Sequence, residues 1–303
     1  MNTQSKLLLI FIFAAHLSFS QDTILVKMEL KAGHITSIRS RPVLSSEKDI
    51  SKFIIIENLK SFIIKRFSVF PEHSAYQDFK NNLMAETDFT ARTKAFDFDS
   101  SKVYKGRSKS IVYCLVGTSI DDKRIIIIDQ NGDYNFNNDH IFAFDITPED
   151  FKPNEAGFFD RKEVNKFLDE QVTAVEVKVE GFYDTTRYSR NILIKPIPYN
   201  TGTSYATKIE QDLELSIELS EHLEGEFILN GNKYYLSMYN ILPYLSYKNK
   251  SFLRLLFRKE NEEFNAKNNN SSHPDFLIIE NKKYLIASVS RFGDEVFLRY
   301  SKE

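Results

Sequence analysis

Short apolar runs rich in Ile, Val, Phe and Tyr recur along most of the chain, separated by Asn, Gly, Asp or Ser. Runs of this kind are typical of β-strands joined by turns. Strict alternation of apolar and polar positions is clearest in the second half of Val172–Glu180, as expected of a strand with one buried face. The pattern predicts strands at Ile24–Leu30, Phe53–Glu57, Phe62–Phe70, Ser110–Val116, Arg124–Asp129, Val172–Glu180, Ser189–Pro196, Leu213–Leu219 and Phe252–Arg258.

Helix signals are fewer. Asp160–Asp169 begins with a residue that can cap a helix, and Glu163 follows at the capping-box spacing. Val164, Phe167 and Leu168 would share one face of that helix. Tyr76–Ala85 is a second candidate. Sequential strands without regular strand–helix alternation predict a mainly β fold, with antiparallel sandwich or meander units and a few short helices.

The C-terminal third contains a faint internal repeat. Phe227–Leu236 matches Phe276–Leu285 in the placing of Phe, Asn, Lys, Tyr and Leu. Each copy predicts two strands around a short turn, and Asn230-Gly231 is the preferred pair for a type I′ hairpin. A further hairpin is expected to turn at Arg291–Glu295. The match is explained either by a true internal duplication or by the general similarity of β-hairpin sequences.

A change of pattern between Thr147 and Asp169 indicates a domain boundary, because strands give way to prolines, a glycine and the candidate helix. We therefore predict an N-terminal β-rich domain at 21–160 and a C-terminal β domain at 170–303.

The first 20 residues are typical of an export signal peptide. Lys6 precedes an apolar run, and Ser18 and Ser20 form a small-x-small cleavage site before Gln21. The alternative is an uncleaved N-terminal anchor. We expect an exported protein, periplasmic or extracellular, with no transmembrane segment in the mature chain. It should not be a lipoprotein, because no cysteine lies near the cleavage site.

Cys114 is the only cysteine, so the chain has no intramolecular disulfide. Its apolar surroundings predict a buried, unreactive thiol. The formal net charge is −2, and the basic residues are dispersed. Nucleic acid binding needs a concentrated positive surface, so we expect no nucleic acid partner.

Candidate metal chemistry is concentrated in the loop from Asp129 to Asp139, in which three aspartates and four asparagines fall within eleven residues. Oxygen ligands of this kind suit Ca²⁺. The spacing begins like an EF-hand but has Gly132 too early and His140 where a glutamate is expected. A plain polar hairpin turn is the alternative. The candidate ligands are Asp129, Asn131, Asp133, Asn135 and Asp139.

No other catalytic or cofactor motif is present. The histidines are scattered without zinc-site spacing, and neither a nucleophile elbow nor a phosphate-binding glycine loop occurs. The chain contains no Trp, which removes the commonest platform for stacking sugars. We therefore predict no catalytic and no cofactor-binding residues.

Two stretches resemble the β-rich N-terminal accessory region of exported bacterial thioredoxin-like reductases. They are Ile125–Phe136 and Pro274–Ile286, the second followed by the hairpin at Gly293. The resemblance implies an envelope protein built from that accessory region alone. The chain has no Cys-x-x-Cys, so redox catalysis is not carried over.

The sequence thus favours an exported, non-catalytic β-rich protein that binds or scaffolds an unknown envelope protein or polymer. The alternative is a hydrolase of an extracellular polymer, whose acid and base carboxylates would come from separate strands.

Overall fold

The structure is a computed structural model that describes residues 23–32, 42, 44–106, 109–146, 152–155, 157–199, 214–218, 221–240, 244–264 and 275–301. The fold is mainly β with antiparallel sheets, as predicted. The predicted signal peptide lies outside the described residues. Among the described helices, none is long and apolar enough to cross a membrane.

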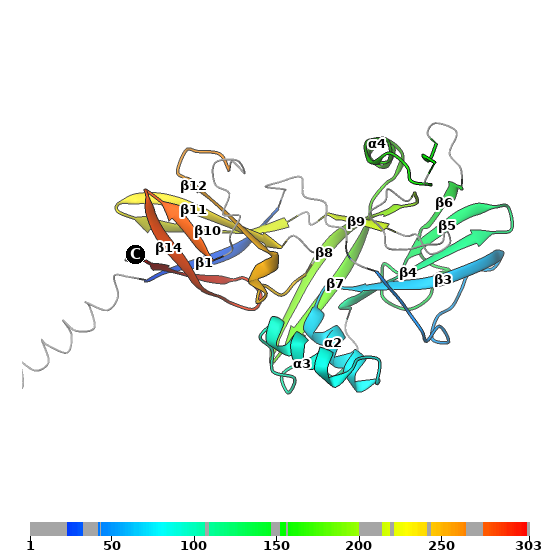
Figure 1. Ribbon diagram of the computed structural model, residues 1–303, viewed down its shortest axis with the longest axis horizontal. Helices are drawn as coiled ribbons and strands as arrows, with labels where there is room; N and C mark the ends of the chain where they lie inside the picture. Colours follow the sequence, from blue (N-terminus) through cyan, green and yellow to red (C-terminus); the bar gives the residue numbers. More distant parts are fainter. Residues whose placement is uncertain are drawn as a thin grey trace, which may run out of the picture. The chain divides into compact units, whose positions relative to one another are not determined.

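The chain forms two compact units (Figure 1), and they divide the sequence differently from the expected domains at 21–160 and 170–303. Unit 1 contains β1 (Thr23–Ala32) together with every described strand after residue 220. Unit 2 contains the strands and helices between them. The difference arises because β1 pairs with two strands from the last third of the chain, a long-range contact that leaves no local sequence pattern.

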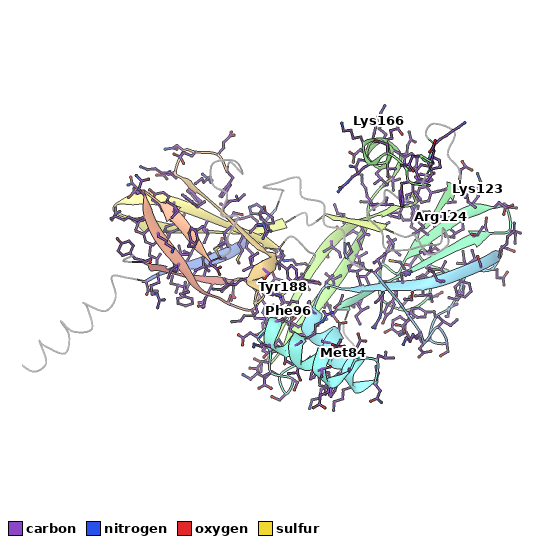
Figure 2. All side chains as sticks on the ribbon, viewed as in Figure 1. Met84, Phe96, Lys123, Arg124, Lys166 and Tyr188 are labelled. Atoms are coloured by element: carbon purple, nitrogen blue, oxygen red, sulfur yellow. The ribbon has the colours of Figure 1, made fainter. Side chains whose placement is uncertain are left out.

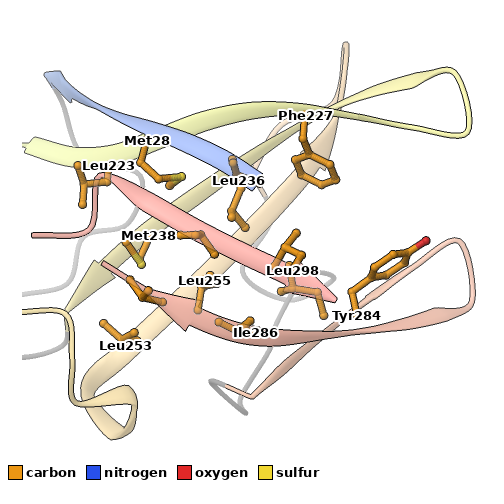
Figure 3. Close-up of a cluster of buried hydrophobic side chains, with 14 of the residues drawn as sticks. Met28, Leu223, Phe227, Leu236, Met238, Leu253, Leu255, Tyr284, Ile286 and Leu298 are labelled. Carbon is orange, nitrogen blue, oxygen red and sulfur yellow. The ribbon is translucent and has the colours of Figure 1, made fainter. Parts of the chain in front are cut away.

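Unit 1 is a seven-stranded sheet in the order β12-β11-β10-β1-β15-β14-β13. The edge strands β12 and β13 contribute Leu255 and Leu277 to one core cluster, which means that the sheet curls around its apolar face. Figure 3 shows this cluster of buried side chains gathered among the strands. The strands are β10 (Glu221–Leu229), β11 (Asn232–Asn240), β12 (Leu253–Lys259), β13 (Phe276–Ile279), β14 (Lys282–Val289) and β15 (Glu295–Tyr300), with a 3-10 turn, η2, at Lys250–Phe252.

The two hairpins of the apparent repeat are both present, but they are offset by one residue. The first turns at Asn230-Gly231, whereas the second turns at Glu280-Asn281. A one-residue offset exchanges the two faces of a strand. Ile228 is accordingly 72% exposed, while Leu277, which the sequence match aligns with it, is 1% exposed.

Unit 2 contains a five-stranded sheet in the order β2-β3-β4-β5-β6 and a three-stranded sheet in the order β7-β8-β9. The contacts that join them include a hydrogen bond from Arg124 (Figure 2) to the Pro198 carbonyl and one from the Tyr199 hydroxyl to the Asp145 carbonyl at 3.1 Å. The strands are β2 (Ser45–Ser46), β3 (Leu59–Ser68), β4 (Ile111–Ser119), β5 (Lys123–Ile128), β6 (Ile141–Asp145), β7 (Val175–Tyr183), β8 (Thr186–Ile197) and β9 (Glu214–Glu218).

The predicted strand at Phe53–Glu57 is wrong. It forms one isolated bridge, between Ile54 and Asn135, because the segment lies against the Asp129 loop instead of a neighbouring strand. The predicted helix at Tyr76–Ala85 is also wrong in its bounds. The chain forms α2 (Pro71–Lys80) and α3 (Glu86–Ala95), separated at Asn82, whose φ of 55° is not helical.

The third described helix, α4 (Arg161–Gln171), confirms the prediction for this segment. Asp160 caps it by accepting hydrogen bonds from the backbone amides of Lys162 and Glu163. Val164 and Leu168 are buried on one face, as the spacing predicts.

The central strands β4 and β5 are buried on both faces, which explains their nearly continuous apolar sequence. Cys114 is fully buried on β4, as predicted, and burial raises the pKa of its thiol well above the usual value.

Candidate ligand-binding cleft

A polar cleft of about 580 Å³ opens on unit 2 and is called the unit 2 cleft here. It is framed by the segment before β3, helix α2, the segment before β4 and the loop that follows β5, and strands β3 and β4 contribute Arg66 and Tyr113. A neighbouring hollow of about 410 Å³ shares several of its residues and extends toward Met84 (Figure 2), in the turn between α2 and α3. The side chains that define the unit 2 cleft are Glu47, Lys52, Arg66, Asp78, Lys105, Lys109, Tyr113 and Tyr134.

An ion group organises the middle of the cleft. The Arg66 Nη2 donates to Asp78 Oδ1 at 2.8 Å, and Arg66 Nε lies 3.8 Å from Glu47 Oε2. Burial by itself would lower the pKa of Arg66, but the bond to Asp78 and the nearby carboxylates raise it above its usual value. The guanidinium stays charged, so the two carboxylates are engaged in holding it.

Beside the ion group lies an aromatic triad of Phe53, Tyr113 and Tyr134. Their ring centroids are 5.1 to 5.4 Å apart, and every pair meets edge to face. Lys52 Nζ lies over all three rings, 5.2 Å from the Phe53 centroid, 4.9 Å from Tyr113 and 5.4 Å from Tyr134. The same ammonium is 3.3 Å from Glu47 Oε2.

The Asp129 loop forms a series of side-chain-to-backbone turns. Asp129 Oδ1 accepts from the amides of Gly132 and Asp133, and its Oδ2 accepts from Tyr134. Asn131, Asp133 and Asn135 each accept from the amide two residues later. The structure therefore brings the predicted ligands into one loop, with their oxygens used largely by the backbone.

Two of the loop carboxylates have altered proton affinity. Burial raises the pKa of Asp139 to about 6, although the amide of Gln130 opposes the change and the charges of Asp129 and Asp133 add to it. Burial also raises the pKa of Asp129, against the opposing effect of its backbone hydrogen bonds. Asp139 Oδ2 is buried and accepts no hydrogen bond from the described residues.

Within the same described part of the chain, no group of three or more His, Cys, Asp or Glu side chains is arranged to hold a metal.

The loop contributes to the cleft mainly through Tyr134. The Tyr134 carbonyl accepts from the Ile54 amide at 2.8 Å, and the Ile54 carbonyl accepts from the Phe136 amide at 3.0 Å. This pairing fixes the Tyr134 ring beside Phe53. The tight turn needs left-handed backbone at Gly132 and Tyr134, with φ of 69° and 70°.

His73 closes the cleft on the α2 side. Its Nδ1 lies 2.6 Å from Ser110 Oγ, and its Nε2 lies 3.1 Å from the Gly106 carbonyl. Burial lowers the pKa of His73, and the Gly106 bond only partly opposes this, so the ring is neutral at neutral pH. Ser110 is fully buried, which makes this pair a structural contact and not an accessible nucleophile.

Sequence reasoning missed most of the cleft. Glu47 and Lys52 lie in one segment, Arg66 on β3 and Tyr113 on β4, and no motif links these three places; the sequence points only to the Asp129 loop. The one available signal was the aromatic residue inside that loop. Comparisons of the chain with protein-family models, curated proteins and solved structures give no match.

Proposed function

We propose that the protein is an exported, non-catalytic binding module of the cell envelope, with the unit 2 cleft as its ligand site. The observation that carries the proposal is the convergence of the ion group and the aromatic triad on one cleft. Ligand sites typically combine an apolar wall with a few fixed polar groups. Glu47 and Asp78 are engaged with Arg66, which favours binding over acid–base hydrolysis by these carboxylates.

Export is part of the proposal and rests on the pattern of the first 20 residues. β1 begins at Thr23, so cleavage before Gln21 would leave this strand whole. Protein recovered from the envelope fraction should start at Gln21 or within a residue or two when its N-terminus is sequenced. Recovery from the cytosol with Met1 intact would contradict export.

Site-specific crosslinking tests the cleft. A photoreactive residue replaces Asn81, which is exposed and lines the cleft, and the matched control replaces the exposed Lys282 of β14. Exposure of each tagged protein to envelope extract and light should give a discrete adduct from position 81 alone. Adducts from neither position, or equally from both, would contradict the proposal. Release of soluble fragments from an envelope polymer would instead support the hydrolase.

We also propose that the Asp129 loop binds a divalent cation such as Ca²⁺. The buried Asp139 Oδ2 supports this proposal. A cation would offset the desolvation of that oxygen and the mutual repulsion of the three carboxylates. Asp139 and Asp133, with the carbonyls of Asn131 and Asn135, would hold the ion. Asp129 is less suited, because it is buried and both of its oxygens accept backbone amides, whereas Asp133 is exposed.

Thermal unfolding in EDTA and in millimolar Ca²⁺ tests this site. Ca²⁺ at a hundredfold excess over Kd adds about 2.7 kcal/mol to the free energy of unfolding. The native protein should therefore melt at a higher temperature in Ca²⁺, and Asp133→Ala should abolish the difference. An equal shift in both proteins would place the ion elsewhere, and no shift in either would leave the loop as a turn.

A further inference from the structure

The aromatic triad has the geometry of a binding box for an organic cation. A cation within about 6 Å of an aromatic centroid is attracted by the ring quadrupole, and three rings add their effects. Lys52 Nζ satisfies this distance for all three rings at once. The box is therefore suited to an ammonium group, and the chain itself supplies the present occupant.

The walls of the box are fixed independently of Lys52. Phe53 and Tyr113 are 7% and 6% exposed and belong to a core cluster with Phe136. Tyr134 packs against that cluster and is held by the hydrogen bonds of its backbone to Asp129 and Ile54. Removing the lysine should leave the three rings in place, which is the preorganisation that a binding site needs.

Lys52 itself is only partly buried. Its side chain is 30% exposed, and the contacts that hold its ammonium are the three rings and Glu47. Glu47, with its side chain 6% exposed, remains at the edge of the box when the lysine leaves. It can then accept a hydrogen bond from, or neutralise, an incoming cation.

The rest of the cleft defines the other half of the ligand. The cleft is lined by four basic side chains, Lys52, Arg66, Lys105 and Lys109, and by three acidic ones, Glu47, Asp49 and Asp78. Because Asp78 and Glu47 hold Arg66, the positive charges that face a ligand are those of Lys105, Lys109 and a displaced Lys52, opposed by the carboxylate of Asp49. A bare cation would be repelled by these groups, whereas an anionic group next to the ammonium would be attracted.

We propose that the unit 2 cleft binds ligands that carry an ammonium group beside an anionic group, with the ammonium replacing Lys52 in the aromatic box. This inference rests on the proposed binding function and assigns it a ligand class. Lys52 acts as an internal competitor that lowers the affinity of the native protein.

Titration calorimetry of the full chain with choline and phosphocholine tests the proposal. Because the competitor is removed, Lys52→Ala should bind phosphocholine about tenfold more tightly than the native protein. Phosphocholine should bind more tightly than choline, and the preference should weaken at high salt. Lys52→Gln keeps most of the side-chain packing and serves as the second variant if Lys52→Ala does not fold.

Substitutions of Tyr134 in the Lys52→Ala protein separate the effect of the aromatic ring from that of side-chain volume. Tyr134→Phe keeps the ring and should retain binding, whereas Tyr134→Leu keeps apolar volume without the ring and should lose about tenfold. Lys233→Ala is the matched control. Lys233 also lies over a tyrosine ring, Tyr235 at 5.2 Å, beside Glu226, but it has no aromatic triad, so its removal should create no site.

Equal affinities of the native and Lys52→Ala proteins, or equal affinities of the Tyr134→Phe and Tyr134→Leu forms, would overturn the inference. Equal binding of choline and phosphocholine would overturn its anionic half. Adducts from position 81 that are unaffected by any of these variants would preserve the binding function and refute the ammonium box alone.

Discussion

At the scale of single residues, burial determines the direction in which an aspartate pKa moves. Asp49 is exposed, and hydrogen bonds from Ser51 lower its pKa. Asp139 is partly buried, and desolvation raises its pKa to about 6 in spite of a bond from the Gln130 amide. Both residues lie in polar segments and accept backbone hydrogen bonds, so the rise at Asp139 comes from the solvent that the fold removes.

The raised pKa of Asp139 makes stability depend on pH. An unfolded aspartate titrates near 3.9, so between about pH 4 and 6 the folded state binds more protons than the unfolded state. The contribution of Asp139 to stability is therefore present at low pH and is lost as the pH rises through 6.

Asp139→Asn should raise the melting temperature at pH 7.5, because it removes the charge that burial penalises, while its amide oxygen can still accept from Gln130. The gain should disappear by pH 4, with all measurements made in EDTA. Asp121→Asn, at an exposed turn, is the control and should show no such dependence. A pH-independent gain would attribute the effect to something other than titration of Asp139.

At the scale of elements, α4 shows how a capping residue places a helix. Asp160 satisfies two backbone amides that the helix itself leaves without partners. Asp160→Ala should cost about 1 kcal/mol, and Asp160→Asn should retain most of the stability because asparagine also caps well. Urea denaturation measures both. Equal loss in the two variants would show that the negative charge, and not the hydrogen bonds, is what stabilises this helix start.

The two hairpins of the apparent repeat share a turn geometry but differ in which strand face is buried. Both turns have left-handed backbone at their two central residues, with φ of 50° and 77° at Asn230 and Gly231 and of 50° and 60° at Glu280 and Asn281. The type I′ geometry is therefore common to both. The matching residues are nevertheless displaced by one position relative to the turn. Residues that match in sequence therefore lie on opposite faces of their strands.

At the scale of the whole molecule, β1 is central to unit 1. It pairs with β10 on one side and β15 on the other, although both strands lie in the last third of the chain. Val26 is fully buried in the core, whereas its neighbour Leu25 is 43% exposed.

Val26→Ala should destabilise unit 1 by about 2 kcal/mol, because it leaves a cavity in the core that all the strands of this sheet share. Leu25→Ala, the matched control, should change stability by less than about 0.5 kcal/mol. Hydrogen exchange should accelerate in β10 and β15 of Val26→Ala while β4 keeps its protection. Simultaneous loss of protection in β4 would mean that the two units unfold together.

The sequence by itself determined the local features of this protein. Strand periodicity located β4, β5 and β7, Asp160 located the start of α4, Asn230-Gly231 located a hairpin, and the apolar setting of Cys114 predicted its burial. These features depend on contacts between residues close in the chain, where spacing alone specifies which side chains share a face.

Only the tertiary structure decided the sheet order of β1, the irregular path of Phe53–Glu57, and the cleft itself. Lys52, Tyr113 and Tyr134 come from three segments, and their meeting depends on which strands pair and how a loop packs across them. Such contacts are stabilised by burial of apolar surface, which is non-directional, so the sequence pattern shows that the rings will be buried without showing which partners they will have.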